Sequence, residues 1–301
     1  MNHIVPVSDI SLRMKTATPN QVHDCPACGA PTPHDFLYDK NHCRIWKCTA
    51  CGIGRTEARD FDPASYYTKD YFDGARSDGY ADYLGAESVL RREFADTVAF
   101  VRSKVSGGRL LDVGCAYGFF LQEAKPYFEV AGIEVAKDAV DHCRRSGLHV
   151  LDGVADRENL QQLGMMDVIV LLDVIEHVPD PLDTLSLCAA HLNPGGVLIL
   201  TTGDFASVTA RAAGRNWRLM TPPQHLWFFT PESMKRLAGL TGLGFEILDH
   251  PWKVVPLSLI FFQLKRMVGL TPGKSGMASG IGVPVNLFDA MRVVMRKPEA
   301  A

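Results

Sequence analysis

From residue 109 onward, short apolar runs alternate with stretches in which apolar residues recur at helical spacing. Five apolar runs predict strands near 109–113, 129–134, 148–151, 167–172 and 196–202. Strands that alternate with helices in this way are typical of βαβ units, which build a parallel sheet covered by helices. Two later runs, at 245–249 and 291–295, predict a sixth and a seventh strand.

The rest of the chain divides into segments of different character. Residues 1–20 are polar and aperiodic and predict a flexible tail, and residues 21–58 form a cysteine-bearing unit. We expect one large α/β domain over 59–301, with a helical insertion at about 252–288 between strands six and seven. Apolar residues spaced along 89–105 predict a helix that ends at Gly107-Gly108.

The first predicted strand leads into a glycine-bearing turn. Asp112 lies near the end of the strand, Gly114 and Gly118 lie in the turn, and a helical pattern starts at Phe119. Glycine lets the backbone approach a ligand closely, and the start of a helix offers free N–H groups. The arrangement predicts a ligand site over the turn.

The second predicted strand ends in an acid, Glu134. A carboxylate at this point can accept hydrogen bonds from both hydroxyls of a ribose, so the pair of motifs predicts a nucleoside site. The turn lacks the G-x-G-x-x-G pattern of dinucleotide-binding enzymes, which counts against an NAD-dependent oxidoreductase. A carboxylate at Asp112 favours a cationic amino acid moiety over a pyrophosphate.

Several motifs occur in a fixed order along the chain. They are LLDVGCAYG at 110–118, GIEV at 132–135, DVIVLLDVIEHVPDP at 167–181, LNPGGVLILTT at 192–202 and PPQHLWFFTPES at 222–233. In these motifs the sequence resembles the class I S-adenosylmethionine-dependent methyltransferases, specifically the small-molecule branch with an "EHV" motif. The resemblance implies a Rossmann-like, mostly parallel seven-stranded sheet with helices on both faces, in which the seventh strand lies antiparallel beside the fifth.

The resemblance also implies a set of residues that bind S-adenosylmethionine. The set is Asp112, Gly114, Cys115, Ala116, Gly118, Glu134, Val135, Asp152, Gly153, Leu172, Asp173, Tyr67 and Tyr71. In the family, the first acid and glycine lie near the methionine end, Glu134 holds the ribose, and Asp173 lies beneath the transferable methyl group. The chain has Cys115 and Ala116 where a Gly-x-Gly run is frequent.

Three members of this set have a second interpretation. Asp152 either meets the adenine amino group or caps the next helix. Tyr67 and Tyr71 either close over the cofactor or pack an N-terminal helix.

Candidate catalytic residues follow the strands at their carboxyl ends, where ligands bind in open α/β sheets. They are His177, Asp204 and His225. His177 either fixes the geometry of its loop or takes part in the chemistry, and His225 either serves as a base or substrate-orienting group or is structural. Asp204 either takes part in the chemistry or caps a helix. The base-methylation motifs Asn-Pro-Pro-Tyr and Asp-Pro-Pro-Tyr are absent after the fourth strand, which favours a small-molecule acceptor. The family resemblance implies methyl transfer to an oxygen or carbon of a sugar, a glycan intermediate or a quinone-like metabolite.

The N-terminal unit contains two C-x2-C pairs. Cys25 and Cys28 form the first pair, and Cys48 and Cys51 form the second. Four thiolates at this spacing predict a closed, structural zinc ribbon, with two disulfides or a redox motif as the alternatives.

The balance of charged residues bears on whether the protein binds nucleic acid. The formal net charge is −3, and residues 1–60 carry seven basic and six acidic side chains, so the ribbon has no phosphate-binding stripe. Nucleic acid is therefore not the favoured partner, although an RNA methyltransferase that uses the ribbon and a non-catalytic cofactor-binding scaffold remain as alternatives. No signal peptide or membrane span is evident, so we expect a reducing cytoplasm.

The C-terminal segment carries an excess of basic side chains. Residues 251–301 carry seven basic and two acidic side chains, and 254–269 is largely apolar. This pattern favours a core or dimer-face helix, and the alternative is a helix that makes peripheral contact with a membrane surface.

Overall fold

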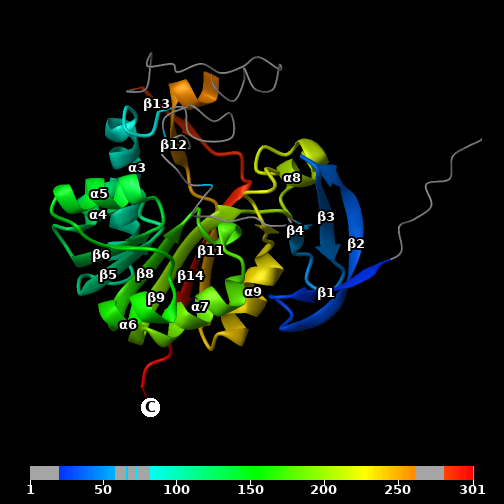
Figure 1. Ribbon diagram of the computed structural model, residues 1–301, viewed down its shortest axis with the longest axis horizontal. Helices are drawn as coiled ribbons and strands as arrows, with labels where there is room; N and C mark the ends of the chain where they lie inside the picture. Colours follow the sequence, from blue (N-terminus) through cyan, green and yellow to red (C-terminus); the bar gives the residue numbers. More distant parts are fainter. Residues whose placement is uncertain (1–19, 58–65, 67–71, 73–81, 262–280, 301) are drawn as a thin grey trace, which may run out of the picture.

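The computed structural model describes residues 20–57, 66, 72, 82–261 and 281–300. Its architecture has two parts: a large sheet covered by helices, and a smaller sheet at the N-terminal end of the chain (Figure 1). The cysteine-bearing unit lies beside helices α8 (Val208–Ala213) and α9 (Pro231–Leu240).

The large sheet has seven strands. In spatial order they are β11 (Gly244–Asp249), β14 (Ala290–Arg296), β9 (Leu192–Gly203), β8 (Met166–Leu172), β5 (Arg109–Val113), β6 (Glu129–Glu134) and β7 (His149–Asp152). Strand β14 runs antiparallel to both of its neighbours, β9 and β11. All seven predicted strands are confirmed, and so is the antiparallel seventh strand beside the fifth.

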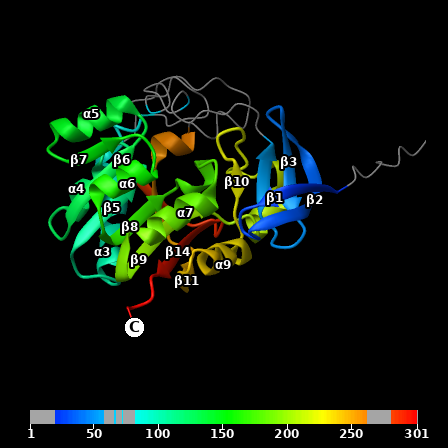
Figure 2. The ribbon, with the colours of Figure 1, turned by 60° about the horizontal axis from the view of Figure 1, so that its bottom comes forward.

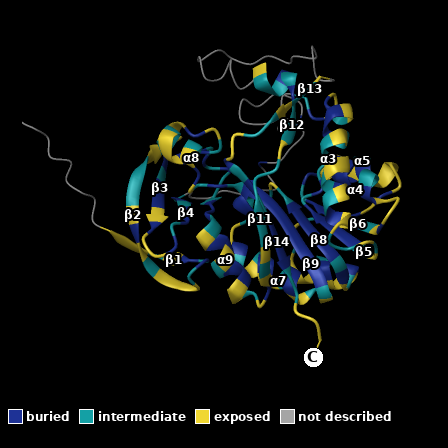
Figure 3. Ribbon diagram, turned by 180° about the vertical axis from the view of Figure 1, so that it is seen from behind, coloured by how far each residue is buried: buried dark blue, intermediate teal, exposed yellow. Residues whose placement is uncertain are grey.

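Helices cover both faces of this sheet (Figure 2). One face packs against α3 (Glu87–Arg102), α4 (Phe119–Ala124) and α5 (Lys137–Arg145), and the other against α6 (Arg157–Leu163), α7 (Pro181–Ala190) and α9. Strand β8 shows the principle. Val168 and Val170 belong to the apolar cluster on the α3, α4 and α5 face, and Ile169 and Leu171 belong to the cluster on the α6, α7 and α9 face. This happens because successive side chains of a strand point to opposite faces of the sheet. Buried residues fill the middle of the sheet (Figure 3).

The small sheet takes its last strand from a distant part of the chain. Strands β1 (Gln21–Cys25), β2 (Ala30–Lys40), β3 (Cys43–Cys48) and β4 (Gly54–Glu57) form an antiparallel meander, and β10 (Trp227–Phe228) pairs with β4. Ile53 of the meander belongs to the same apolar cluster as Leu111 of the large sheet. The N-terminal unit is therefore joined to the large domain by both backbone pairing and a shared core.

The segment between β11 and β14 differs from the prediction. The helical insertion predicted for 252–288 is wrong at its ends, where β12 (Lys253–Pro256) and β13 (Gly282–Val285) form an antiparallel pair. Val254, Val255 and Val283 are β-branched, which favours an extended backbone. Residues 257–261 are helical, and 262–280 lie outside the described residues. Within the described part of the chain, no helix is long and apolar enough to cross a bilayer.

Candidate functional site

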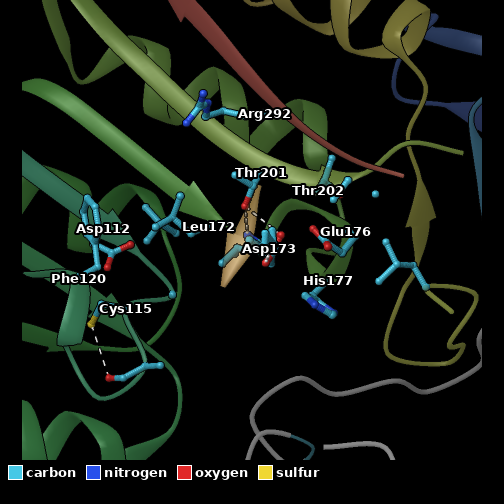
Figure 4. Close-up of a pocket in the computed structure, with 18 of the residues that line it drawn as sticks. Asp112, Cys115, Phe120, Leu172, Asp173, Glu176, His177, Thr201, Thr202 and Arg292 are labelled. Atoms are coloured by element: carbon cyan, nitrogen blue, oxygen red, sulfur yellow. Dashed lines mark hydrogen bonds and ion pairs between the residues drawn. The ribbon is translucent and has the colours of Figure 1, made fainter. Parts of the chain in front are cut away.

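A cavity of about 980 Å³ opens at the carboxyl ends of β5, β6, β8 and β9. This volume is at the upper end of the range of about 300–1,000 Å³ for small-molecule sites, so the cavity has room for two ligands side by side. Figure 4 shows its wall, with Asp112 and Cys115 near one end and Glu176 and His177 near the other.

The turn between β5 and α4 adopts left-handed backbone at alternate residues. The φ angles are 75° at Gly114, 45° at Ala116 and 76° at Gly118. A Cβ atom on Gly114 would lie 2.6 Å from Val174 Cγ2, and one on Gly118 would lie 2.5 Å from Leu148 Cδ1. Both glycines therefore make room for protein side chains. Gly114 also lines the cavity, whereas Gly118 does not.

Two acids, Asp112 and Glu134, lie in the same wall of the cavity. Burial, and then the charge of Glu134, raise the pKa of Asp112 well above its ordinary value. Glu134 accepts backbone N–H bonds from Ala136 and Ala116, each at 2.8 Å. A carboxylate has about four acceptor positions, so Glu134 retains acceptor capacity for hydroxyl donors. Two neighbouring carboxyl groups in an apolar wall suit a ligand that has hydroxyl donors for one acid and a positive charge for the other.

Most of the other predicted cofactor residues line the same cavity. These are Cys115, Ala116, Val135, Gly153, Leu172 and Asp173. In the described part of the chain, Gly118 and Asp152 do not line it. Asp152 is not a helix cap either, because α6 is capped by Asp156, whose side chain accepts from the Asn159 N–H. Tyr67 and Tyr71 lie outside the described residues.

The structure brings His177 and His225 together. Their ring centroids are 4.7 Å apart, although the two residues are far apart in sequence. His177 ends the short helix η1 (Ile175–His177), and its Nδ1 lies 2.8 Å from the carbonyl oxygen of Gln224. A carbonyl can only accept, so Nδ1 carries the proton and Nε2 is the accepting nitrogen of the ring.

Burial keeps both rings uncharged. It lowers the pKa of His177 to about 4. Burial, followed by the neighbouring His177, also lowers the pKa of His225 well below its ordinary value. Ligand-type atoms of Glu176, His177 and His225 lie within 4.8 Å of one another, so a third titratable group adjoins the pair. Burial raises the pKa of Glu176 to about 8.

Asp204, the third candidate for catalysis, lies elsewhere. Its Oδ1 accepts from the Ala206 N–H at 2.9 Å, and its Oδ2 lies 3.0 Å from His250 Nε2. In the part of the chain that the structure describes, Asp204 does not line the cavity. Its side chain holds the turn ahead of α8, where Ser207 is the cap.

Several charged residues of the cavity had not been predicted. Lys253, at the start of β12, donates to Asp173 Oδ2 at 2.5 Å. Arg218 donates from Nε and Nη2 to the carboxylate of Asp289, at 2.9 and 2.8 Å. Glu93 of α3 also lines the cavity. The one sequence signal is at Glu93, which lies four residues after Val89 and so falls on the apolar face of the predicted helix.

The four predicted cysteine ligands converge outside this cavity. Their sulfur atoms all lie within 4.8 Å of one another, with Cys25 and Cys51 at 3.5 Å and Cys28 and Cys48 at 3.9 Å. In a tetrahedral zinc site with bonds of about 2.3 Å, sulfur atoms are about 3.8 Å apart. None of the four forms a disulfide, and the left-handed glycines that follow each pair shape the two knuckles.

Comparisons with known proteins agree with this architecture. A family model described as a methyltransferase domain matches residues 87–250. A ubiquinone biosynthesis O-methyltransferase from Xanthomonas euvesicatoria is 35% identical over 194 residues, which cover 59% of this chain and 80% of that protein. The protein of that name from Methylococcus capsulatus is 29% identical over 190 residues, covering 56% of this chain and 78% of that protein.

A solved structure supports the fold. Magnesium protoporphyrin IX methyltransferase from Synechocystis PCC 6803, with bound SAH, aligns at a TM-score of 0.51 and 13% identity and covers 78% of this chain and 97% of its own. Together with the ordered motifs and the cavity at the carboxyl ends of the strands, these matches show that the chain belongs to the class I S-adenosylmethionine-dependent methyltransferases.

Proposed function

We propose that the protein methylates a hydroxyl oxygen of a small, quinone-like aromatic acceptor. The relatives named ubiquinone biosynthesis O-methyltransferase support this acceptor class. The observation that carries the proposal is the neutral His177, whose Nε2 lone pair belongs to a ring that lines the cavity. S-adenosylmethionine, when bound, supplies an electrophilic methyl group on its sulfonium.

The wall with Asp112 and Glu134 is the proposed seat of the cofactor. Glu134 accepts hydrogen bonds from the ribose hydroxyls, while the backbone N–H groups of Ala116 and Ala136 fix its carboxylate. Asp112 balances the positive charge of the methionine moiety. Val135 and Gly153 line the adenine side, and Leu172 and Asp173 lie towards the methyl group.

In the proposed reaction, the acceptor hydroxyl gives its proton to His177 Nε2. The oxygen lone pair forms the new C–O bond as the C–S bond of the methyl donor breaks. The products are a methyl ether and the thioether S-adenosylhomocysteine, and the proton leaves the imidazolium for water. A pKa of about 4 keeps His177 neutral at neutral pH, so its Nε2 can accept a proton. The same low pKa makes the ring a weak base, so the imidazolium passes its proton on rapidly.

The test is methyl transfer from labelled S-adenosylmethionine to a panel of catechols, sugars and RNA. We expect product with catechols, and we expect His177→Ala to lower kcat by about 100-fold or more, because a positioned base contributes about 10²–10⁴-fold. His191→Ala is the matched control, since His191 caps the end of α7 and bonds to the Leu187 carbonyl.

Other outcomes would contradict the proposal. A kcat within a few-fold of wild type in His177→Ala would remove the base assignment. Methylation of sugars alone, or of RNA alone, would show that the acceptor is a sugar or an RNA and not a quinone-like aromatic compound. Binding of S-adenosylhomocysteine with no turnover on any member of the panel would favour the cofactor-binding scaffold.

The cofactor seat has its own test. We expect Glu134→Ala to weaken S-adenosylhomocysteine binding by about 10- to 100-fold, because hydrogen bonds to a charged group contribute about 1.5–3 kcal/mol. Glu129→Ala, at the exposed start of the same strand, should leave the Kd unchanged. Isothermal titration calorimetry measures both. Equal affinities in the two variants would rule out Glu134 as the ribose ligand.

We also propose that the N-terminal cysteine cluster holds a structural zinc ion. Four thiolates complete a tetrahedral shell and leave no position for a substrate. The Thr32 hydroxyl lies 3.2 Å from Cys48 Sγ, and the Arg236 guanidinium donates to Cys28 Sγ at 3.6 Å. Such outer contacts offset part of the negative charge that four thiolates bring.

A further inference from the structure

Lys253 brings a positive charge to the place where the acceptor must bind. It is the first residue of β12, on the strand pair inserted between β11 and β14. Its Nζ reaches Asp173, the residue that directly follows β8. Both side chains line the cavity, together with His177 and His225. The inserted hairpin therefore supplies one wall of the acceptor site.

Asp173 is firmly held in this position. Its φ angle is 56°, in the left-handed region, and its backbone N–H donates to both the carbonyl and the hydroxyl oxygen of Thr201. The Thr201 hydroxyl in turn donates to Asp173 Oδ1 at 2.9 Å, as Figure 4 shows. Strained backbone that its neighbours fix in this way is a recurring property of functional sites.

The Lys253 ammonium has hydrogen-bonding capacity to spare. An ammonium carries three N–H donors. Among the described residues, one of these donors has a partner, Asp173 Oδ2. The remaining donors are available to a ligand, because the Lys253 side chain lines the cavity and is 25% exposed.

The other charged groups around Lys253 keep it protonated. Burial favours the neutral amine, but the charges of Asp173 and then Glu93 outweigh it and raise the pKa of Lys253. Burial raises the pKa of Glu93 to about 7, and this side chain also accepts a hydrogen bond from the Val254 backbone. Arg218 acts in the opposite direction as a second positive charge, and Asp289 binds it through two hydrogen bonds.

We propose that the Lys253 ammonium, held by Asp173, binds the ionised hydroxyl oxygen of a phenol-type acceptor. This inference rests on the proposed function and sharpens it to a substrate with an acidic hydroxyl. The acceptor O–H bond breaks and its proton goes to His177 Nε2. The oxyanion is stabilised by Lys253 until its lone pair forms the C–O bond and the C–S bond of the methyl donor breaks. Aliphatic alcohols, which ionise far less readily, are poor substrates on this view.

The experiment uses 4-nitrocatechol, whose ionisation is visible by absorbance, and the full-length protein saturated with S-adenosylhomocysteine. A positive charge nearby lowers the pKa of an acidic group by about 1–3 units. We expect the pKa of bound nitrocatechol to fall by about 1 unit or more in wild type. Lys253→Met should abolish this fall, and Lys253→Arg should retain it. Lys235→Met, an exposed lysine of α9, is the matched control.

A further variant separates this role from a loss of structure. In Asp173→Asn the ammonium loses its compensating carboxylate, so the pKa of bound nitrocatechol should fall further than in wild type. Opposite shifts in Lys253→Met and Asp173→Asn cannot come from unfolding.

Equal pKa values in wild type and Lys253→Met would overturn the proposal, and so would a wild type that binds S-adenosylhomocysteine but not nitrocatechol. Failure to bind S-adenosylhomocysteine would instead contradict the proposed function.

Discussion

At the scale of single residues, Glu176 is held in an unfavourable environment. It is 4% exposed, and its Oε2 has no hydrogen-bond partner among the described residues. Burial, and then the charge of Asp173, raise its pKa to about 8. An unfolded glutamate ionises near pH 4.3. Between these two values the folded chain retains a proton that the unfolded chain releases, so the free energy of unfolding falls as the pH rises.

We therefore predict that Glu176→Gln stabilises the protein at pH 8. The neutral amide does not lose stability between about pH 4.3 and 8, so its advantage over wild type grows through this window and then levels off. We expect a gain of about 1–3 kcal/mol in the free energy of unfolding at pH 8. Urea unfolding at several pH values measures it. Glu158→Gln, in the first turn of α6, is the control, and parallel stability curves for Glu176→Gln and wild type would contradict the prediction.

The sequence alone could predict only part of the site. Glu134 could be predicted, because it ends a strand whose neighbours fix where its carboxylate points. Lys253 could not, because its role depends on contact with Asp173, 80 residues away in the chain. Local pattern does not encode which distant segment covers the mouth of a cavity. The same limit applies to Asp204, which follows a strand end as a site residue does and yet bonds to Ala206 and His250.

At the scale of elements, the strands of the large sheet were predictable because each is a short, mainly apolar run, in which charges such as Glu246 and Arg292 are isolated. The two residues of β10 carry no such signal, and β12 and β13 lie in a segment whose apolar residues also suit a helix. Pairing with β4 makes Trp227 and Phe228 a strand, which is a tertiary effect. The strands that the sequence analysis missed were therefore the very short one and those that depend on a pairing partner.

The proposed zinc site of the N-terminal unit gives a prediction about the thermal unfolding of the whole chain. Removing zinc should lower the Tm of the whole chain in one transition, because Cys25, Cys48 and Ile53 pack in the same cluster as the core of the large sheet. Metal analysis and calorimetry before and after chelation measure this. Cys48→Ser should lose the zinc, and Cys43→Ser, a buried thiol outside the cluster, should keep it.

The zinc prediction has a clear alternative. If the ribbon were an independent unit, chelation would produce two transitions, with the upper one at the Tm of the untreated protein. A full-length protein that contains no zinc, and whose Tm does not change on chelation, would contradict the metal assignment itself.

At the scale of the whole molecule, large apolar side chains are exposed around the inserted hairpin. Trp252 is 67% exposed and Phe288 is 63% exposed. The apolar segment 254–269 starts on this hairpin, and its residues from 262 onward lie outside the described part. In the sequence, Lys265, Arg266 and Lys274 lie between β12 and β13, and apolar groups exposed near basic residues favour an anionic membrane surface.

We predict that the protein sediments with anionic vesicles at low salt and is released at high salt, because charge attraction is screened by ions. Trp252→Ser should weaken sedimentation several-fold. Val22→Ser, an equally exposed apolar residue on β1, should not change it. Protein that stays in the supernatant with every vesicle composition would contradict the prediction.

The pairing of β4 with β10 also has a consequence for synthesis. Thr56 donates to the carbonyl oxygen of His225, 169 residues later in the chain. At about 5–20 residues per second, a ribosome needs on the order of 10–30 s to reach that point. During this interval the nascent ribbon presents the unpaired edge of β4, a surface on which strands of other chains can add. On the proposed zinc assignment, early capture of the metal matters most during translation, because it would rigidify the meander before β10 has been synthesised.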